Sequence, residues 1–258
     1  MGGREKYYSL RYLWKSTFSN KILEINISGE KIMRILIVDN NFDVSFYPQG
    51  AVVRMALAPK NIFNVRTVTP DILNETHMDF DRVILTGSTS YIRQETEWMK
   101  KERDYIEKWI KRGIPLLGIC FGGQLISRHL FGISSIQALP VPISGSIMME
   151  YKEGCSIFGG LPNPFGVVTA HYEGFSVEEK YRIAAIPEWE SYAFNYQDIA
   201  YGLQFHPELM GHIGRTLVKM QKFFFDRHVF QEFSIKTHAR HGTLILQNFL
   251  KEPEADKQ

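Results

Sequence analysis

One cysteine of this chain stands in the local sequence expected of a catalytic nucleophile. Cys120 lies in the segment Gly118–Gln124 (GICFGGQ), between the apolar stretch Ile114–Leu117 and a run with helical spacing. Glycines permit the sharp turn from strand to helix on which a nucleophile is exposed. The N-terminus of the helix favours the thiolate, which is the reactive form of cysteine. These residues predict covalent catalysis through the sulfur of Cys120.

A second motif supplies the proton-transfer groups that such a nucleophile needs. His206 and Glu208 lie near the end of Tyr201–Glu208 (YGLQFHPE), two residues apart around Pro207. Side chains two apart at the end of a strand leave on the same side of the chain. The imidazole can act as base toward the thiol while the carboxylate fixes its tautomer. We therefore predict a triad of Cys120, His206 and Glu208, although the sequence does not show that they meet.

The two motifs together resemble those of the class I (triad) glutamine amidotransferases. The resemblance is strongest to standalone proteins similar to the glutaminase domain of GMP synthase, from about residue 33 to 208, with Gln247–Leu250 also similar. It implies a flavodoxin-like α/β fold and hydrolysis of the side-chain amide of glutamine. The implied route is a γ-glutamyl thioester with release of ammonia, and it needs no metal or organic cofactor.

The tetrahedral intermediate of this chemistry requires hydrogen-bond donors for its oxyanion. The backbone N–H of Phe121 follows the nucleophile and is one candidate. The resemblance assigns the second donor to Gly87, in the segment Thr86–Ser90 that occupies the place of the family's glycine loop. Thr89 stands where the family usually has proline, so the path of this loop is open.

Four further residues match positions that contact glutamine in the resembling family. Gln124 lies four residues after the nucleophile, and His171, Tyr172 and Glu173 fall on the family's Ser-His-Gly-Asp block. Tyr172 replaces glycine there, which bears on the identity of the substrate rather than on the chemistry. Gly123 stands where histidine or methionine is common, which would leave additional room beside the nucleophile.

Composition narrows the class of protein. The chain has 258 residues, of which 44% are hydrophobic and 22% charged, with a formal charge of +2. This predicts a globular protein, and the charge gives no indication of a nucleic-acid or membrane partner. Its two cysteines, Cys120 and Cys155, form no disulfide framework. With no apolar run of transmembrane length and no signal-peptide core, we expect a cytoplasmic location.

The elements that must position these residues can be read from the apolar pattern. Strands and helices alternate up to Cys120, which predicts a parallel sheet with helices on both faces. Shorter strands after residue 165 predict an antiparallel C-terminal section. The expected strands are 33–39, 63–68, 82–86, 114–117, 166–169, 182–186, 192–196 and 199–205, and the expected helices include 51–58 and 98–110.

The domain organisation follows from the same pattern. We expect an N-terminal extension over 1–32, one amidotransferase domain over 33–250 and a tail over 251–258. Residues 211–240 form a basic, phenylalanine-rich helical insertion, read either as a helix packed on the domain or as an interface for a partner.

Three functions remain open. The first is glutamine hydrolysis that delivers ammonia to a separate synthase subunit. The alternative is a γ-glutamyl peptide hydrolase with the same triad, and the third is a non-catalytic binding protein. Glutamine is favoured because Gln124, His171 and Glu173 keep the family's pattern.

Overall fold

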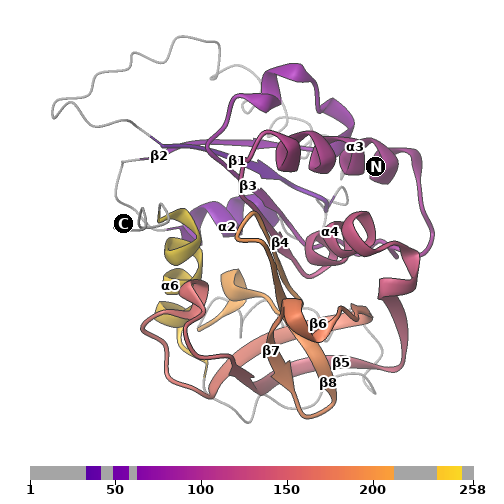
Figure 1. Cartoon of the computed structure of the whole chain (residues 1–258). Helices are drawn as coiled ribbons and strands as arrows, with labels where there is room; N and C mark the ends of the chain where they lie inside the picture. Colours follow the sequence, from indigo (N-terminus) through magenta and orange to yellow (C-terminus); the bar gives the residue numbers. More distant parts are fainter. Residues whose placement is uncertain (1–32, 42–48, 58–62, 212–236, 252–258) are drawn as a thin grey trace, which may run out of the picture. The chain divides into compact units, whose positions relative to one another are not determined.

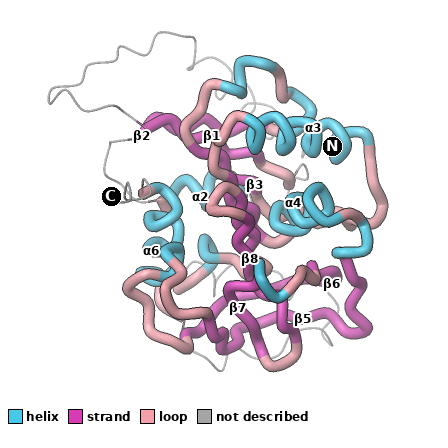
Figure 2. Tube along the Cα trace, in the orientation of Figure 1, coloured by secondary structure: helices cyan, strands magenta, loops and turns pink. Residues whose placement is uncertain are grey.

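A mixed β-sheet lies at the centre of the protein (Figures 1 and 2). The structure, a computed structural model, describes residues 33–41, 49–57, 63–211 and 237–251. Within these ranges the strands form a nine-stranded sheet of order β2-β1-β3-β4-β9-β8-β7-β5-β6. The strands are β1 (Met33–Val38), β2 (Phe63–Val68), β3 (Arg82–Leu85), β4 (Leu116–Ile119), β5 (Ile136–Tyr151), β6 (Phe165–Phe175), β7 (Arg182–Ile186), β8 (Trp189–Tyr196) and β9 (Ala200–Leu203).

Helices cover both faces of the parallel part of this sheet (Figure 1). The α-helices are α2 (Gln49–Ala56), α3 (Glu97–Lys111), α4 (Phe121–Phe131) and α6 (Ala239–Leu250). Short 3₁₀ turns include η2 (Glu75–Met78) and η6 (Pro207–Leu209). Helices α2 and α6 lie on one face, and α3 and α4 on the other.

The covering of both faces explains why β1 is apolar at every position from Ile35 on. Ile35 and Ile37 belong to a core with residues of α2 and α6, whereas Leu36 and Val38 belong to a core with residues of α3 and α4. A strand buried on both faces reads as a continuous apolar run. The predicted fold class, a flavodoxin-like sheet with an antiparallel section, is confirmed.

Strand β9 departs from the expectation in a way that matters for the site. The sequence placed residues 199–205 in the antiparallel section, but β9 pairs in parallel with β4 and antiparallel with β8. It therefore closes the parallel series β2-β1-β3-β4-β9. The carboxyl ends of β3, β4 and β9 consequently meet at one edge of the sheet.

The longest strand of the sheet was not predicted. β5 runs over 16 residues and pairs antiparallel with β6, with a register shift between Ala138 and Ile143. Pro140 and Pro142 fall in that interval, where the ladder does not require their missing N–H groups. β6 also extends well beyond the expected 166–169. The strands β5 to β8 gather at one end of the molecule (Figure 2).

Several expected segments lie outside the described residues. These are the extension 1–32, most of the expected helical insertion (212–236) and the tail from 252. Of the remaining insertion residues, Thr237 and His238 precede α6, which begins at Ala239. In the described ranges no helix has both the length and the apolar character needed to cross a membrane.

Candidate active site

Cys120 occupies the turn between β4 and α4, as the sequence predicts. Its backbone has φ 50° and ψ −107°, an unusual conformation for a residue with a side chain, and it is 5% exposed. Strain of this kind is retained where the surrounding fold enforces it. A Cβ on Gly118 would lie 2.4 Å from the backbone of Gly122, and a Cβ on Gly122 would lie 2.4 Å from the carbonyl oxygen of Leu85. The glycines therefore allow α4 to begin directly against the sheet.

Backbone hydrogen bonds attach this turn to the strands on either side. The N–H of Cys120 donates to the carbonyl of Leu203 in β9 (2.6 Å). The N–H of Gly122 donates to the carbonyl of Thr86, just after β3 (3.1 Å). The nucleophile candidate is thus held between the ends of β3 and β9.

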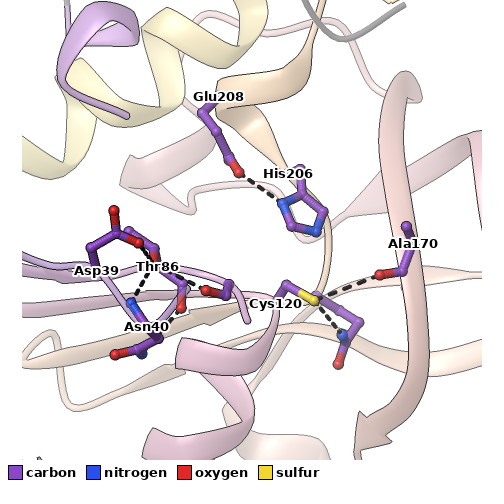
Figure 3. A network of polar contacts seen from close by, with 9 residues as sticks. Asp39, Asn40, Thr86, Cys120, Ala170, His206 and Glu208 are labelled. Carbon is purple, nitrogen blue, oxygen red and sulfur yellow. Dashed lines mark hydrogen bonds and ion pairs between the residues drawn. The ribbon is translucent and has the colours of Figure 1, made fainter. Parts of the chain in front are cut away.

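The sulfur of Cys120 lies beside two groups that the sequence analysis did not single out (Figure 3). It contacts the carbonyl oxygen of Ala170 at 3.9 Å and the Nε2 atom of Gln204 at 3.8 Å. Gln204 is fully buried and directly follows β9. Its position two residues before His206 in YGLQFHPE was the available signal, because alternate residues leave an extended chain on one side.

His206 and Glu208 form a buried pair. Nδ1 of His206 lies 2.7 Å from Oε1 of Glu208, and both residues are 4% exposed (Figure 3). The expectation that strand alternation aligns them is wrong, because β9 ends at Leu203 and Glu208 lies within η6. The tight 3₁₀ turn, opened by Pro207, brings the carboxylate back to the imidazole.

Electrostatics at this pair favour a charged imidazole. Burial by itself disfavours the imidazolium, but the carboxylate of Glu208 and the sulfur of Cys120 outweigh it and raise the pKa of His206 to about 10. The sulfur therefore lies close enough to the imidazole to influence its charge. The imidazole is therefore placed to act as the acid–base group toward the sulfur.

The two expected oxyanion donors lie next to this group. A Cβ on Gly87 would lie 3.1 Å from Cε1 of His206 and 2.9 Å from Oε1 of Gln49, so only glycine fits there without displacement. Phe121 is the first residue of α4, and its buried ring packs against Trp98 at 5.6 Å. The ring of Phe121 thus belongs to the core, and its backbone remains at the turn.

Three of the four expected substrate-site residues face inward and bond to one another. Nε2 of Gln124 donates to the carbonyl of Glu173 (2.6 Å), and Nδ1 of His171 donates to the same carbonyl (2.9 Å). Nε2 of His171 lies 3.1 Å from the hydroxyl of Tyr192. Burial lowers the pKa of His171 to about 4, so its imidazole is neutral at pH 7. Gln124 therefore does not point at solvent.

The carboxylate of Glu173 anchors the loop that follows Gly87. Its Oε2 accepts a hydrogen bond from the N–H of Ile92 (2.7 Å), and burial raises its pKa. On the other side, Arg128 of α4 donates to the carbonyl of Ile92 and pairs with Glu95 at 3.0 Å. The loop is therefore fixed to β6 and to α4.

The two departures from the family pattern lie in different surroundings. Tyr172 is 37% exposed, and its ring lies 6.0 Å from that of Tyr91 on the loop after Gly87. A Cβ on Gly123 would lie 3.2 Å from backbone atoms of Gly118 and Leu203. Gly123 thus serves the close packing of α4 on the sheet, and the additional room expected beside the nucleophile is filled by backbone.

No group of three or more histidine, cysteine or acidic side chains that could hold a metal occurs in the part of the chain that the structure describes.

Comparison with known proteins identifies the family of the chain. The profile of the family described as "Glutamine amidotransferase class-I" matches residues 8–225. The chain belongs to the class-I glutamine amidotransferases. Anthranilate synthase component 2 of Methanothermobacter marburgensis is 31% identical over 185 residues, covering 69% of this chain and 91% of the relative. A glutamine-hydrolyzing GMP synthase subunit of Thermoplasma acidophilum is 29% identical over 147 residues, covering 55% of this chain and 70% of the relative.

Solved structures agree with this class-I assignment. A protein from Thermoplasma acidophilum that is described as a GMP synthase subunit superposes with a TM-score of 0.58 and 25% identity, covering 76% of this chain and 96% of that one. A glutamine amidotransferase from Thermotoga maritima superposes with a TM-score of 0.64 at 20% identity, covering 86% and 97%. The second likeness shows the shared fold.

Proposed function

We propose that this class-I amidotransferase hydrolyses the side-chain amide of glutamine through Cys120 and releases ammonia for transfer to an acceptor. One observation carries the proposal: Cys120, His206 and Glu208 lie at one edge of the sheet, with the imidazole bonded to the carboxylate of Glu208 and close enough to the sulfur of Cys120 for the sulfur to raise its pKa. That geometry matches the roles of nucleophile, acid–base and orienting group.

The proposed reaction has two stages. The Cys120 thiolate attacks the amide carbon, and the N–H groups of Gly87 and Phe121 stabilise the oxyanion. The tetrahedral intermediate collapses as the His206 imidazolium gives its proton to the departing amide nitrogen, leaving a γ-glutamyl thioester and ammonia. His206 then takes a proton from water, which attacks the thioester carbon and releases glutamate. Glu208 orients the imidazole throughout and supports its positive form.

We propose that Gln124, His171, Tyr172 and Glu173 form the substrate side of the site. The carbonyl of Ala170 lies 3.9 Å from the sulfur, so this part of β6 is within reach of a substrate bound at Cys120. The bonds of Gln124 and His171 to the carbonyl of Glu173 fix the course of the strand there. This supports a role in shaping the pocket through the backbone of β6.

We propose that the ammonia passes to a separate synthase protein that acts as its acceptor. The similar proteins from Methanothermobacter marburgensis and Thermoplasma acidophilum carry the names of a synthase component and of a synthase subunit. A cytoplasmic location fits an enzyme with a thiol nucleophile, since Cys120 and Cys155 are both free cysteines.

A γ-glutamyl peptide hydrolase is the second candidate, and the exposed ring pair of Tyr91 and Tyr172 favours it. Two exposed rings 6.0 Å apart would offer contact to a leaving group larger than ammonia. Glutamine remains the first proposal because Gly123 provides no additional space beside the nucleophile. A non-catalytic binding role is less favoured, because Cys120, His206 and Glu208 lie together at one edge of the sheet.

Active-site labelling tests the nucleophile. The glutamine analogue 6-diazo-5-oxo-norleucine should alkylate Cys120, and mass spectrometry of the peptides should find Cys155 unmodified. Burial raises the pKa of Cys155 to about 11, which keeps it a poorly reactive thiol. Cys155→Ala serves as the control, and its Cys120 should be alkylated to the same extent as in wild type. Labelling at Cys155 alone would overturn the triad.

Substrate choice is decided by kcat/KM for glutamine and for a γ-glutamyl dipeptide on the purified chain, with Cys120→Ala as blank. An ammonia-delivering protein should prefer glutamine and gain activity when its partner is added. A preference for the dipeptide of more than about tenfold, or roughly 1.4 kcal/mol of transition-state binding, would reject ammonia delivery.

A further inference from the structure

One carboxyl group outside the proposed triad is fully buried without a hydrogen-bond partner in the described part of the chain. Glu102 lies on α3, is 0% exposed, and neither of its carboxyl oxygens has a hydrogen-bond partner among the described residues. The amide oxygen of Asn40, just beyond β1, is likewise buried without a partner. The side chain of Asn40 lies near enough to the Glu102 carboxyl group to affect its pKa, although no hydrogen bond of good geometry joins the two side chains as they stand.

A proton on Glu102 would give the amide oxygen of Asn40 a hydrogen-bond donor. An ionised carboxylate and an amide oxygen are both acceptors, so neither can satisfy the other. A neutral carboxylic acid can donate its O–H to Oδ1 of Asn40. The amide nitrogen of Asn40 donates to the carbonyl of Thr86 at 3.2 Å. The amide oxygen and the amide nitrogen of Asn40 then both have partners.

We propose that Glu102 is protonated in the native fold and that its O–H donates to the amide oxygen of Asn40, which positions the backbone that carries Gly87. Glu102 is thus a positioning residue. Its effect on turnover depends on the proposed glutaminase function, whereas its protonation does not.

The connection from Glu102 to the site runs through Thr86. The carbonyl of Thr86 accepts both the amide of Asn40 and the N–H of Gly122 (3.1 Å), and the N–H of Asn40 donates to Oγ1 of Thr86 (2.9 Å). Thr86 directly precedes Gly87, and Gly122 directly follows Phe121. Figure 3 shows Asn40 and Thr86 next to the Cys120 turn. The pair therefore supports the backbone of both proposed oxyanion donors.

The surroundings favour the neutral acid. Burial raises the pKa of Glu102 to about 8, against a smaller opposing effect of the Asn40 contact. Charged or titratable groups of the neighbouring elements are engaged elsewhere. Asp39 accepts from the N–H of Gly50, Arg103 and Arg128 pair with Glu95, and His77 contacts Asn74. Because these neighbouring groups have other partners, none of them supplies a cation to Glu102, and its carboxyl group retains the proton.

Two substitutions at Glu102 test the positioning role. Glu102→Gln keeps a donor and an acceptor facing Asn40 at every pH, and Glu102→Leu removes both. For wild type, kcat for glutamine should fall as the pH rises through about 8, where Glu102 ionises. Glu102→Gln should have a kcat at neutral pH within roughly threefold of wild type, and its kcat should not fall near pH 8. Glu102→Leu should lose at least about tenfold in kcat relative to wild type, with KM little changed.

The control for this profile is His206, whose own titration near pH 10 should remain in Glu102→Gln. A fall in kcat near pH 8 that persists in Glu102→Gln would overturn the proposal. Equal kcat for wild type and a folded Glu102→Leu would overturn it as well.

A readout without turnover tests the proton itself. Infrared difference spectra between wild type and Glu102→Gln should contain the C=O stretch of a protonated carboxylic acid at neutral pH, and the band should disappear above about pH 8. A carboxylate signal at neutral pH would overturn the protonation. If wild type does not hydrolyse glutamine, the proposed function fails, and the infrared band still decides the state of Glu102.

Discussion

Two buried glutamates on opposite faces of the sheet meet different partners, although their burial is nearly the same. Glu208 is 4% exposed and lies in η6, next to Leu209 of the core shared with α2 and α6. Glu102 is 0% exposed and lies on α3 between Met99 and Ile106 of the other core. Glu208 meets the imidazole of His206, whereas Glu102 meets the neutral amide of Asn40.

The difference teaches that the partner of a buried carboxyl group matters as much as its burial. Burial penalises the charged form of a carboxyl group, and a nearby cation offsets that penalty. Glu208 faces the imidazole that the proposed reaction uses as its acid and base. At Glu102 a neutral acid completes a hydrogen-bonded pair that holds the backbone. Glutamate thus interacts with the proposed catalytic imidazole on one face of the sheet, at Glu208, and positions backbone on the other face, at Glu102.

The largest expected effect is on kcat, and it appears when the same change, glutamate to glutamine, is made separately at each of the two sites. Glu208→Gln should lower kcat for glutamine about 10²–10⁴-fold, because the imidazolium loses its carboxylate and the tautomer its constraint. Glu102→Gln should remain near wild type at neutral pH. Ammonia release measures the rates, and circular dichroism confirms folding. Comparable losses in the two variants would remove the distinction drawn between the sites.

A smaller effect is expected from the packing that supports Glu208. Gly242 of α6 approaches η6 so closely that its Cβ would lie 2.0 Å from the carbonyl oxygen of Pro207. Gly242→Ala should cost about 1–3 kcal/mol of unfolding free energy through overpacking, against the usual gain from alanine in a helix. It should also lower kcat, because Pro207 links His206 to Glu208. Urea unfolding measures the first effect, with exposed Arg240→Ala on the same helix as control. A stabilised, fully active Gly242→Ala would show that α6 does not fix η6.

The smallest effect over a single pH unit concerns Glu102. Because its pKa is raised from 4.5 to about 8 on folding, its contribution to stability is fully present below pH 4.5 and is lost as the pH rises to about 8. Wild type should lose up to about 1.4 kcal/mol of unfolding free energy per pH unit in this window relative to Glu102→Gln. Urea unfolding at several pH values gives the difference. If the unfolding free energies of the two proteins changed in parallel with pH, Glu102 would have the same pKa in the folded and unfolded states, which contradicts this prediction.

Short-range patterns in the sequence predicted a large part of the candidate site. The turn at Cys120 was predictable because Gly118 and Gly122 are required within a few residues of it, and the buried strand before it is a continuous apolar run. The long strand β5 was not predictable. Its alternation is interrupted at Pro140 and Pro142, and its pairing partner is distant in the chain.

The sequence by itself determined which residues are candidates for the proposed chemistry and which stretches are buried on both faces, because backbone preference and apolar periodicity act over a few neighbouring residues. Only the tertiary structure decided that β9 runs beside β4, which places Gln204 at the sulfur of Cys120 across 84 residues of chain. It also decided that Glu102 meets Asn40. Neither contact has a local signal, since both depend on strand order, register and the packing of α3 on the sheet, which the whole core fixes together.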